Sequence, residues 1–250
     1  PEARYYDLLR SDTFLRLSVR PSILREELAM LPPGTTVIID EVQKLPILLD
    51  EVHALIEDKQ LRFVLTGSSA RKLRRAGVNL LGGRARVLRL HPLVSSEIGD
   101  YDVERILTYG SLPAIYDSDE PWQDLKAYSG TYLKEEIAAE GAARRLDAFS
   151  RFLHIAALYS GKQINFEAWS SDAAVPARTV REYFSVLSDT LIGEMLEPWK
   201  SGTKRKPAST GKCYFFDIGV RNALAGIQSI APGTDEYGNA FEHFIYEELR

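Results

Sequence analysis

The stretch Thr36–Pro46, TVIIDEVQKLP, places two adjacent carboxylates directly after a short β-branched run. Such a run is typical of a strand that is buried on both faces of a parallel sheet. Ligands of open α/β sheets bind at the carboxyl ends of the strands. Asp40 and Glu41 would therefore lie where one acid can hold Mg²⁺ and the other can orient an attacking water. The alternative is that Asp40 caps the following turn and Glu41 is only solvated.

A helix and a second strand are predicted to follow. Residues 46–58, PILLDEVHALIED, begin with a proline that suits the first helical turn and carry one apolar stripe. Residues 62–69, RFVLTGSS, are apolar and then small and polar. A right-handed strand–helix–strand crossover would place Thr66 and Ser68 beside Asp40. Hydroxyls there could bond the attacking water or a phosphate, or they could simply cap the next helix.

The charge of the chain is unevenly distributed. A net charge of −4 over 250 residues argues against a protein that coats nucleic acid. Residues 62–89 nevertheless carry eight basic residues and no acid. Such a patch attracts the phosphate of a nucleotide or of a nucleic-acid backbone, unless it is a solvated helix face. Within it, Arg84 follows two glycines that allow close backbone approach.

These stretches resemble a known family. TVIIDEVQKLP followed by RFVLTGSSARKLRRAGVNLLGGRARVLRLHPL is similar to the core of prokaryotic AAA-family ATPases that carry a C-terminal domain of unknown function, and YGSLPAIY, YLKEEI and KCYFFDIGVRNAL resemble their C-terminal half. The resemblance implies an α/β fold with a parallel-sheet P-loop core, ATP and Mg²⁺ as cofactors, and hydrolysis coupled to a remodelling or regulatory task in a homo-oligomer. It implies Asp40 for Mg²⁺, Glu41 for the water, Thr66 and Ser68 as sensors, and Arg84 as an arginine finger.

One part of that family's nucleotide site does not occur in these 250 residues. The phosphate loop, G-x-x-x-x-G-K-[ST], cradles phosphates with its backbone N–H groups. Gly161-Lys162 and Gly211-Lys212 are followed by glutamine and cysteine and do not fit the motif. The opening PEARYYDLLRSDTFLRL resembles the family segment between this loop and the strand that ends in Asp40. We therefore expect the sequence to start downstream of its phosphate loop, and this chain alone to be inactive as an ATPase.

In this interpretation, residues 1–120 form the ATPase core, with a last strand at Val87–Leu90, and residues 121–250 form a mostly helical region. Helices are predicted within this second region, with residues 146–160 forming one of them. Residues 238–250, GNAFEHFIYEELR, predict a helix with an apolar face of Phe241, Phe244, Ile245 and Leu249. It resembles the first helix of the nuclease-like element in this family, whose metal-binding acids lie further along the sequence.

A winged helix is predicted inside the second region. Residues 166–191 have the pattern of a helix-turn-helix, and two strands could flank a basic loop of 13 residues. In a winged helix, Arg178, Thr179 and Arg181 would face a DNA major groove, and the loop residues Lys204, Arg205 and Lys206 would meet backbone phosphates. Winged helices also serve as packing modules. The alternative function is therefore a non-catalytic DNA-binding or protein-interaction protein with a degenerate ATPase core.

The remaining composition predicts a cytoplasmic protein without a membrane partner. No apolar stretch approaches the roughly 20 residues needed to span a bilayer, and no signal-peptide pattern opens the sequence. A single cysteine, Cys213, cannot form an internal disulfide, and the four histidines lack metal-ligand spacing. We therefore expect no metal site made of protein ligands alone.

Overall fold

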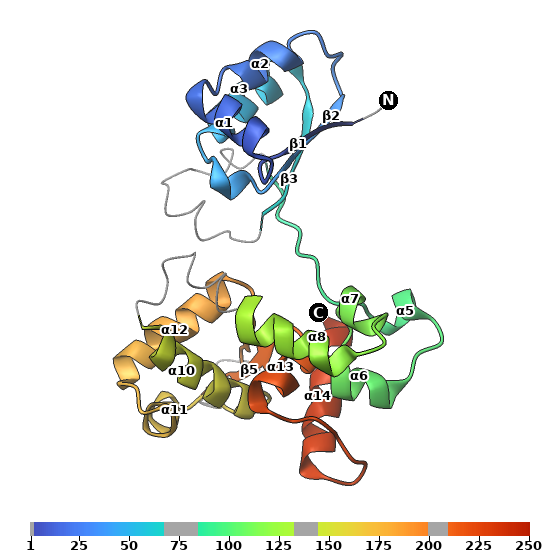
Figure 1. The fold of residues 1–250 in the computed structure, drawn as a ribbon, viewed down its shortest axis with the longest axis vertical. Helices are drawn as coiled ribbons and strands as arrows, with labels where there is room; N and C mark the ends of the chain where they lie inside the picture. Colours follow the sequence, from blue (N-terminus) through green and yellow to red (C-terminus); the bar gives the residue numbers. More distant parts are fainter. Residues whose placement is uncertain (1–2, 68–84, 133–144, 200–209) are drawn as a thin grey trace. The chain divides into compact units, whose positions relative to one another are not determined.

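The computed structural model describes residues 3–67, 85–132, 145–199 and 210–250. The chain divides into two compact units, Pro1–Leu88 and Arg89–Arg250, each with its own elements (Figure 1). Of the predicted site residues, five lie outside the described ranges: Ser68, Arg84, Lys204, Arg205 and Lys206.

The first unit is built on a three-stranded parallel sheet in the order β1-β2-β3. Its strands are β1 (Arg4–Asp7), β2 (Thr36–Asp40) and β3 (Arg62–Leu65). The predicted strand that ends in Asp40 and its parallel neighbour are both confirmed. In this register Tyr5 lies opposite Ile38, which lies opposite Val64.

Three helices lie on one side of this sheet (Figure 1). They are α1 (Ser11–Val19), α2 (Ile23–Leu28) and α3 (Leu48–Lys59), and a short 3₁₀ turn, η1 (Val42–Lys44), follows β2. Tyr6, Val37 and Ile39 are buried in the core shared with these helices. Because side chains alternate along a strand, Tyr5 and Val64 lie on the other face, where they are 58% and 48% exposed.

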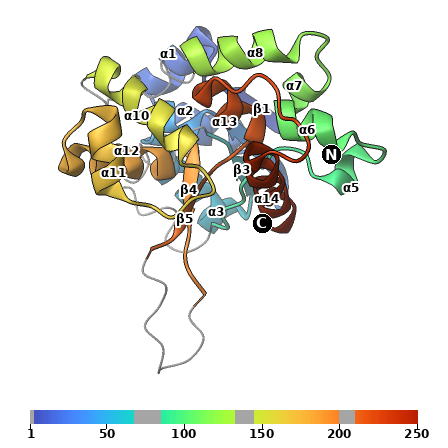
Figure 2. The same cartoon turned by 90° about the horizontal axis from the view of Figure 1, so that it is seen from below.

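The second unit is mostly helical, as was predicted for residues 121–250. Its helices are α5 (Ser95–Ile98), α6 (Val103–Tyr109), α7 (Pro113–Tyr116), α8 (Pro121–Ala127), the π-helix η3 (Tyr128–Tyr132), α10 (Leu146–Leu158), α11 (Phe166–Ala173), α12 (Ala177–Asp189), α13 (Ile218–Ala225) and α14 (Asp235–Leu249). β4 (Gly193–Leu196) and β5 (Lys212–Phe215) pair antiparallel, side by side in Figure 2. No helix within the described ranges has the length and apolar character needed to cross a membrane.

Aromatic side chains hold α10, α11 and α12 together. Trp169 of α11 is fully buried, with ring centroids 6.1 Å from Phe152 of α10 and 5.9 Å from Phe184 of α12. Tyr183 of α12 completes the group, in edge contact with Phe149 at 4.9 Å. Such pairs are favourable beyond the area that they bury. The predicted apolar stripe of α12 is therefore its packing face, which leaves the opposite face to solvent.

The strand predicted at Val87–Leu90 is wrong. Residues 85–90 have no regular secondary structure, and Val87, Leu88 and Leu90 are strongly exposed. An apolar run becomes a strand only where a neighbouring strand pairs with it and a packed surface covers its side chains. Neither is provided to this segment by the part of the chain that the structure describes.

The apolar face predicted for α14 is also largely wrong. Phe244 is buried, but its buried neighbours are Ala240, His243 and Glu247, whereas Leu249 is 83% exposed. The helix faces the start of α13, where backbone N–H groups need acceptors. The carboxyl of Glu247 lies near Ile218 at this end of α13, and its Oε1 lies 3.3 Å from Nε2 of His243.

Candidate active site at the carboxyl edge of the sheet

Asp40 is held by side chains from both neighbouring strands. Thr66, directly after β3, donates its hydroxyl to Oδ1 of Asp40, and Tyr5 of β1 donates its hydroxyl to Oδ2 at 2.6 Å. These two hydrogen bonds, that of Thr66 first, hold the pKa of Asp40 below its ordinary value. Asp40 is therefore an ionised carboxylate of fixed orientation at neutral pH.

Glu41 occupies a backbone conformation that is unusual for its residue type. Its φ of 59° lies in the left-handed region, which costs a non-glycine residue on the order of 1 kcal/mol. Strained residues of this kind cluster at functional sites. The carboxylate accepts a hydrogen bond of 2.6 Å from the side-chain amide of Gln43 in η1. Both acids at the end of β2 thus have side-chain donors that orient them.

Gln43 is buried and occupies the space beside Gly67. A Cβ placed on Gly67 would lie 2.1 Å from Oε1 of Gln43, so a larger residue there would displace the amide that orients Glu41. The backbone supports the same arrangement, because Val42 N–H donates to Thr66 O at 3.0 Å. The residues that follow β3 therefore support both acids. Thr66 bonds Asp40, and Gly67 leaves room for Gln43, which bonds Glu41.

The donor set fits a Mg²⁺ ion that is shared with a nucleotide. Within the described residues, no group of three or more His, Cys, Asp or Glu side chains could hold a metal ion. Mg²⁺ in nucleotide sites is typically bound by one or two carboxylates, waters and substrate phosphates. A carboxylate has about four lone-pair sites, and the two hydroxyls use two of them. Asp40 retains acceptors for the ion or for a water bound to it.

Tyr5 and Gln43 were not among the residues predicted from the sequence. The hydrogen bond to Asp40 raises the pKa of Tyr5 to about 12, so the phenol keeps its proton. The signal that identifies Tyr5 is the register of the parallel sheet, in which β1 is the second neighbour of β2. The sequence pattern gave no strand at Arg4–Asp7, so this signal was not accessible before the structure.

The predicted DNA-binding arginines lie on the exposed face of α12, each beside a carboxylate. Arg178 is 92% exposed and pairs with Glu182 at 3.3 Å. Arg181 pairs with Glu167 of α11 at 2.9 Å, and its guanidinium lies over the Phe166 ring, 5.2 Å from the centroid. Thr179, between them, is only partly exposed. The positive charge of this face is therefore largely offset by its own acids.

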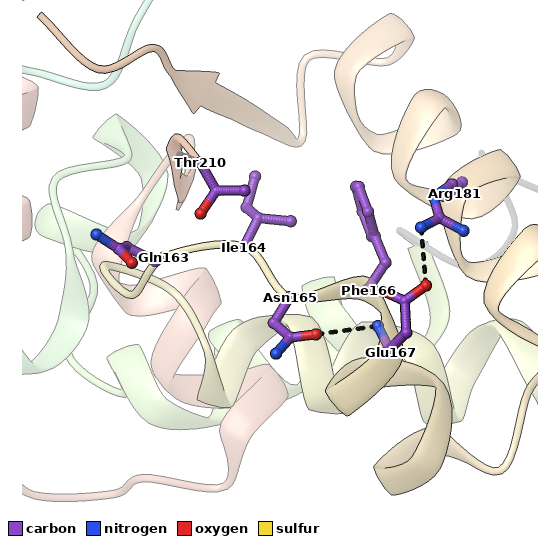
Figure 3. Close-up of a pocket in the computed structure, with 7 residues that line it drawn as sticks. All are labelled: Gln163, Ile164, Asn165, Phe166, Glu167, Arg181 and Thr210. Carbon is purple, nitrogen blue, oxygen red and sulfur yellow. Dashed lines mark hydrogen bonds and ion pairs between the residues drawn. The ribbon is translucent and has the colours of Figure 1, made fainter. Parts of the chain in front are cut away.

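A pocket of about 570 Å³ adjoins Arg181 (Figure 3). Its lining includes Gln163, Asn165 and Thr210 as well as the Arg181–Glu167 pair. Asn165 caps α11 by accepting from the N–H groups of Glu167 and Ala168 at 3.2 and 3.1 Å. The pocket is mostly polar and partly open to solvent, and Thr210 in its lining directly precedes Gly211 and β5.

Residues 2–99, which contain the parallel sheet and Asp40 at its carboxyl edge, match the family described as an AAA domain. Residues 100–231 match the family described as a domain of unknown function, DUF8612, and the chain belongs to this family. These matches confirm the predicted combination of an AAA-type core with a C-terminal domain of unknown function.

Two mycobacterial proteins are similar to this chain. An uncharacterized protein of Mycobacterium tuberculosis is 25% identical over 220 residues, which cover 84% of this chain and 49% of that protein. An uncharacterized protein of Mycobacterium bovis gives the same values. The chain therefore spans about half the length of the curated relatives it matches.

Proposed function

We propose that the first unit supplies the metal-holding and water-orienting part of an AAA-type site for ATP hydrolysis. Asp40 carries the proposal: it is ionised, it is oriented by hydroxyls from both neighbouring strands, and it lies at the edge where α/β sheets bind ligands. The AAA domain match supports nucleotide binding. The hydrolysis would be coupled to a remodelling or regulatory task.

Each side chain of this edge has a distinct role in the proposal. Asp40 holds Mg²⁺ or a water bound to it, and Glu41 accepts a proton from the attacking water. Thr66 lies at the same edge of the sheet and would sense the phosphate. When bound, Mg²⁺ would neutralise charge on the transferring phosphoryl group. Ser68 as a second sensor and Arg84 as a finger between subunits remain predictions.

Separating the two acids tests this function. In the product of the complete gene, we expect Glu41→Gln to retain ATP binding and to lower turnover about 100-fold or more, because a general base contributes at least that much. Asp40→Ala should weaken Mg²⁺-dependent ATP binding itself. Binding is measured with a fluorescent ATP analogue, and turnover by phosphate release.

Asp58→Asn is the matched control, since it removes one exposed carboxylate from α3 of the same unit. It should change neither binding nor turnover. Near-normal turnover by Glu41→Gln would make Glu41 a bystander and would overturn its proposed role.

A second function is favoured by one observation in the other unit. Three helices, α10 to α12, are followed by the β4–β5 hairpin, which is the element order of a winged helix, and Arg178 of α12 is almost fully exposed. We propose DNA binding on α12 as the second candidate. Bound phosphate would have to displace Glu182 and Glu167 from the two arginines, which lowers the expected affinity.

The carboxylate partners give a specific test of DNA binding. Glu167→Gln releases Arg181 from its ion pair, so affinity for duplex DNA should rise about two- to five-fold, whereas Arg181→Ala should lower it. Asp172→Asn is the control, because it removes the same charge from α11 where the partner is the Tyr159 hydroxyl. Fluorescence anisotropy at several salt concentrations measures both effects. No binding at low salt would leave this region as a packing module.

A further inference from the structure

Two adjacent tyrosines of β1 donate to carboxylates on opposite faces of the sheet. Tyr5 bonds Oδ2 of Asp40 at 2.6 Å, and Tyr6 bonds Oε2 of Glu27 in α2 at 3.0 Å. Tyr6 is buried in the core, whereas Tyr5 is 58% exposed. The two hydroxyls therefore make the same kind of hydrogen bond, one on the packed face of the sheet and one on its exposed face.

The contact of Tyr5 completes the orientation of Asp40. Thr66 alone bonds only Oδ1, and a carboxylate held at one oxygen can still swing about that bond. The second bond, from the strand on the other side of β2, holds Oδ2 as well. With one hydroxyl bonded to each oxygen, the carboxylate of Asp40 cannot rotate, and its unused lone pairs keep a constant orientation.

We propose that Tyr5 is a positioning residue for Asp40, and that its hydroxyl sets the affinity of this carboxylate for the Mg²⁺ of a Mg-nucleotide. The inference rests on the proposed function, because it assigns Tyr5 to the same site. Residues that orient a metal ligand typically change metal affinity or activity 10- to 100-fold when they are replaced. Because Tyr5 is exposed, its hydroxyl contributes little to the stability of the fold.

The test compares Tyr5→Phe with Tyr6→Phe in the product of the complete gene. The two variants lose the same atom from neighbouring positions of one strand. We expect Tyr5→Phe to raise the Mg²⁺ concentration for half-maximal binding of a fluorescent ATP analogue about 10-fold, and Tyr6→Phe to leave it unchanged. At saturating Mg²⁺, kcat of Tyr5→Phe should approach that of the unchanged protein.

A double-variant cycle separates positioning from a general effect on the fold. In Asp40→Asn, where the charged acceptor is gone, adding Tyr5→Phe should change the Mg²⁺ dependence no further. An equal Mg²⁺ dependence for Tyr5→Phe and Tyr6→Phe would overturn the role of Tyr5 while leaving the proposed function intact. Absence of Mg²⁺-dependent nucleotide binding by the unchanged protein would overturn both.

Discussion

Gly219→Ala is expected to destabilise the second unit by about 3 kcal/mol, because its methyl group has no space. A Cβ on Gly219 would lie 1.9 Å from the carbonyl oxygen of Tyr109 and 2.9 Å from the backbone nitrogen of Gly110. These are backbone atoms at the end of α6. They cannot turn aside as a flexible side chain would.

The two helices also cannot separate to make room. Asn222 of α13 donates its side-chain amide to the carbonyl oxygens of Leu107 and Thr108, each at 2.9 Å. Asp217, which caps α13, accepts from Ser111 N–H at 2.9 Å. Moving α13 away from α6 would leave these buried groups unpaired, at a cost of about 1–3 kcal/mol for each.

Urea unfolding followed by circular dichroism measures the effect. Gly238→Ala is the matched control, because Gly238 lies in α14 with no atom within 4 Å of the added Cβ. Alanine there should stabilise the chain by about 0.5–1 kcal/mol, as is usual in a helix. Equal stability of the two variants would show that α6 and α13 do not approach as closely as the structure has them.

Glu247→Gln is expected to stabilise the chain at neutral pH. The carboxyl is buried between α14 and the start of α13, and burial, with Asp217 nearby, raises its pKa well above the ordinary 4.5. The uncharged carboxyl is therefore favoured over a wider pH range in the folded chain than in the unfolded chain. Glutamine has the same shape and carries no charge at any pH.

The direction in which stability changes with pH follows from the number of protons bound in the folded and unfolded states. Above pH 4.5, unfolded Glu247 releases its proton while the folded form keeps it, so stability falls as pH rises through this window. The glutamine variant loses no such proton. Its advantage should be absent below pH 4.5 and should grow as the pH rises from 4.5 toward the raised pKa of the folded carboxyl. Buried His243, whose Nε2 lies 3.3 Å from Oε1 of Glu247, has its pKa lowered to about 3 and stays uncharged between pH 4.5 and 7.

Urea unfolding at pH 4.5 and at pH 7 provides the measurement. Glu248→Gln is the control: this neighbouring carboxylate is only partly buried and accepts from the N–H and hydroxyl of Ser95 at 2.8 and 2.6 Å. Its replacement weakens these two hydrogen bonds and should not stabilise the chain at pH 7. A constant difference between Glu247→Gln and the unchanged chain at both pH values would mean that Glu247 ionises in the folded state.

Local sequence pattern determined the central elements of both units. The β-branched run before Asp40, the apolar stripe of α3 and the spacing of buried residues in α12 each follow from one periodicity within one segment. The position of Asp40 and Glu41 at the end of a parallel strand follows from the same information. The exposure of Arg178 and Arg181 also follows from it, since their positions lie outside the apolar stripe of α12.

Only the tertiary structure decided which groups meet across segments. Tyr5 reaches Asp40 through sheet register, and Glu167 reaches Arg181 from another helix. Glu247 of α14 is buried near the start of α13, with Nε2 of His243 3.3 Å from its Oε1. Periodicity records which side chains are apolar, but a buried polar group is stable only where a partner from elsewhere in the chain satisfies it. Val87, Leu88 and Leu90 likewise did not form a strand, because a strand requires a neighbour that no local pattern can supply.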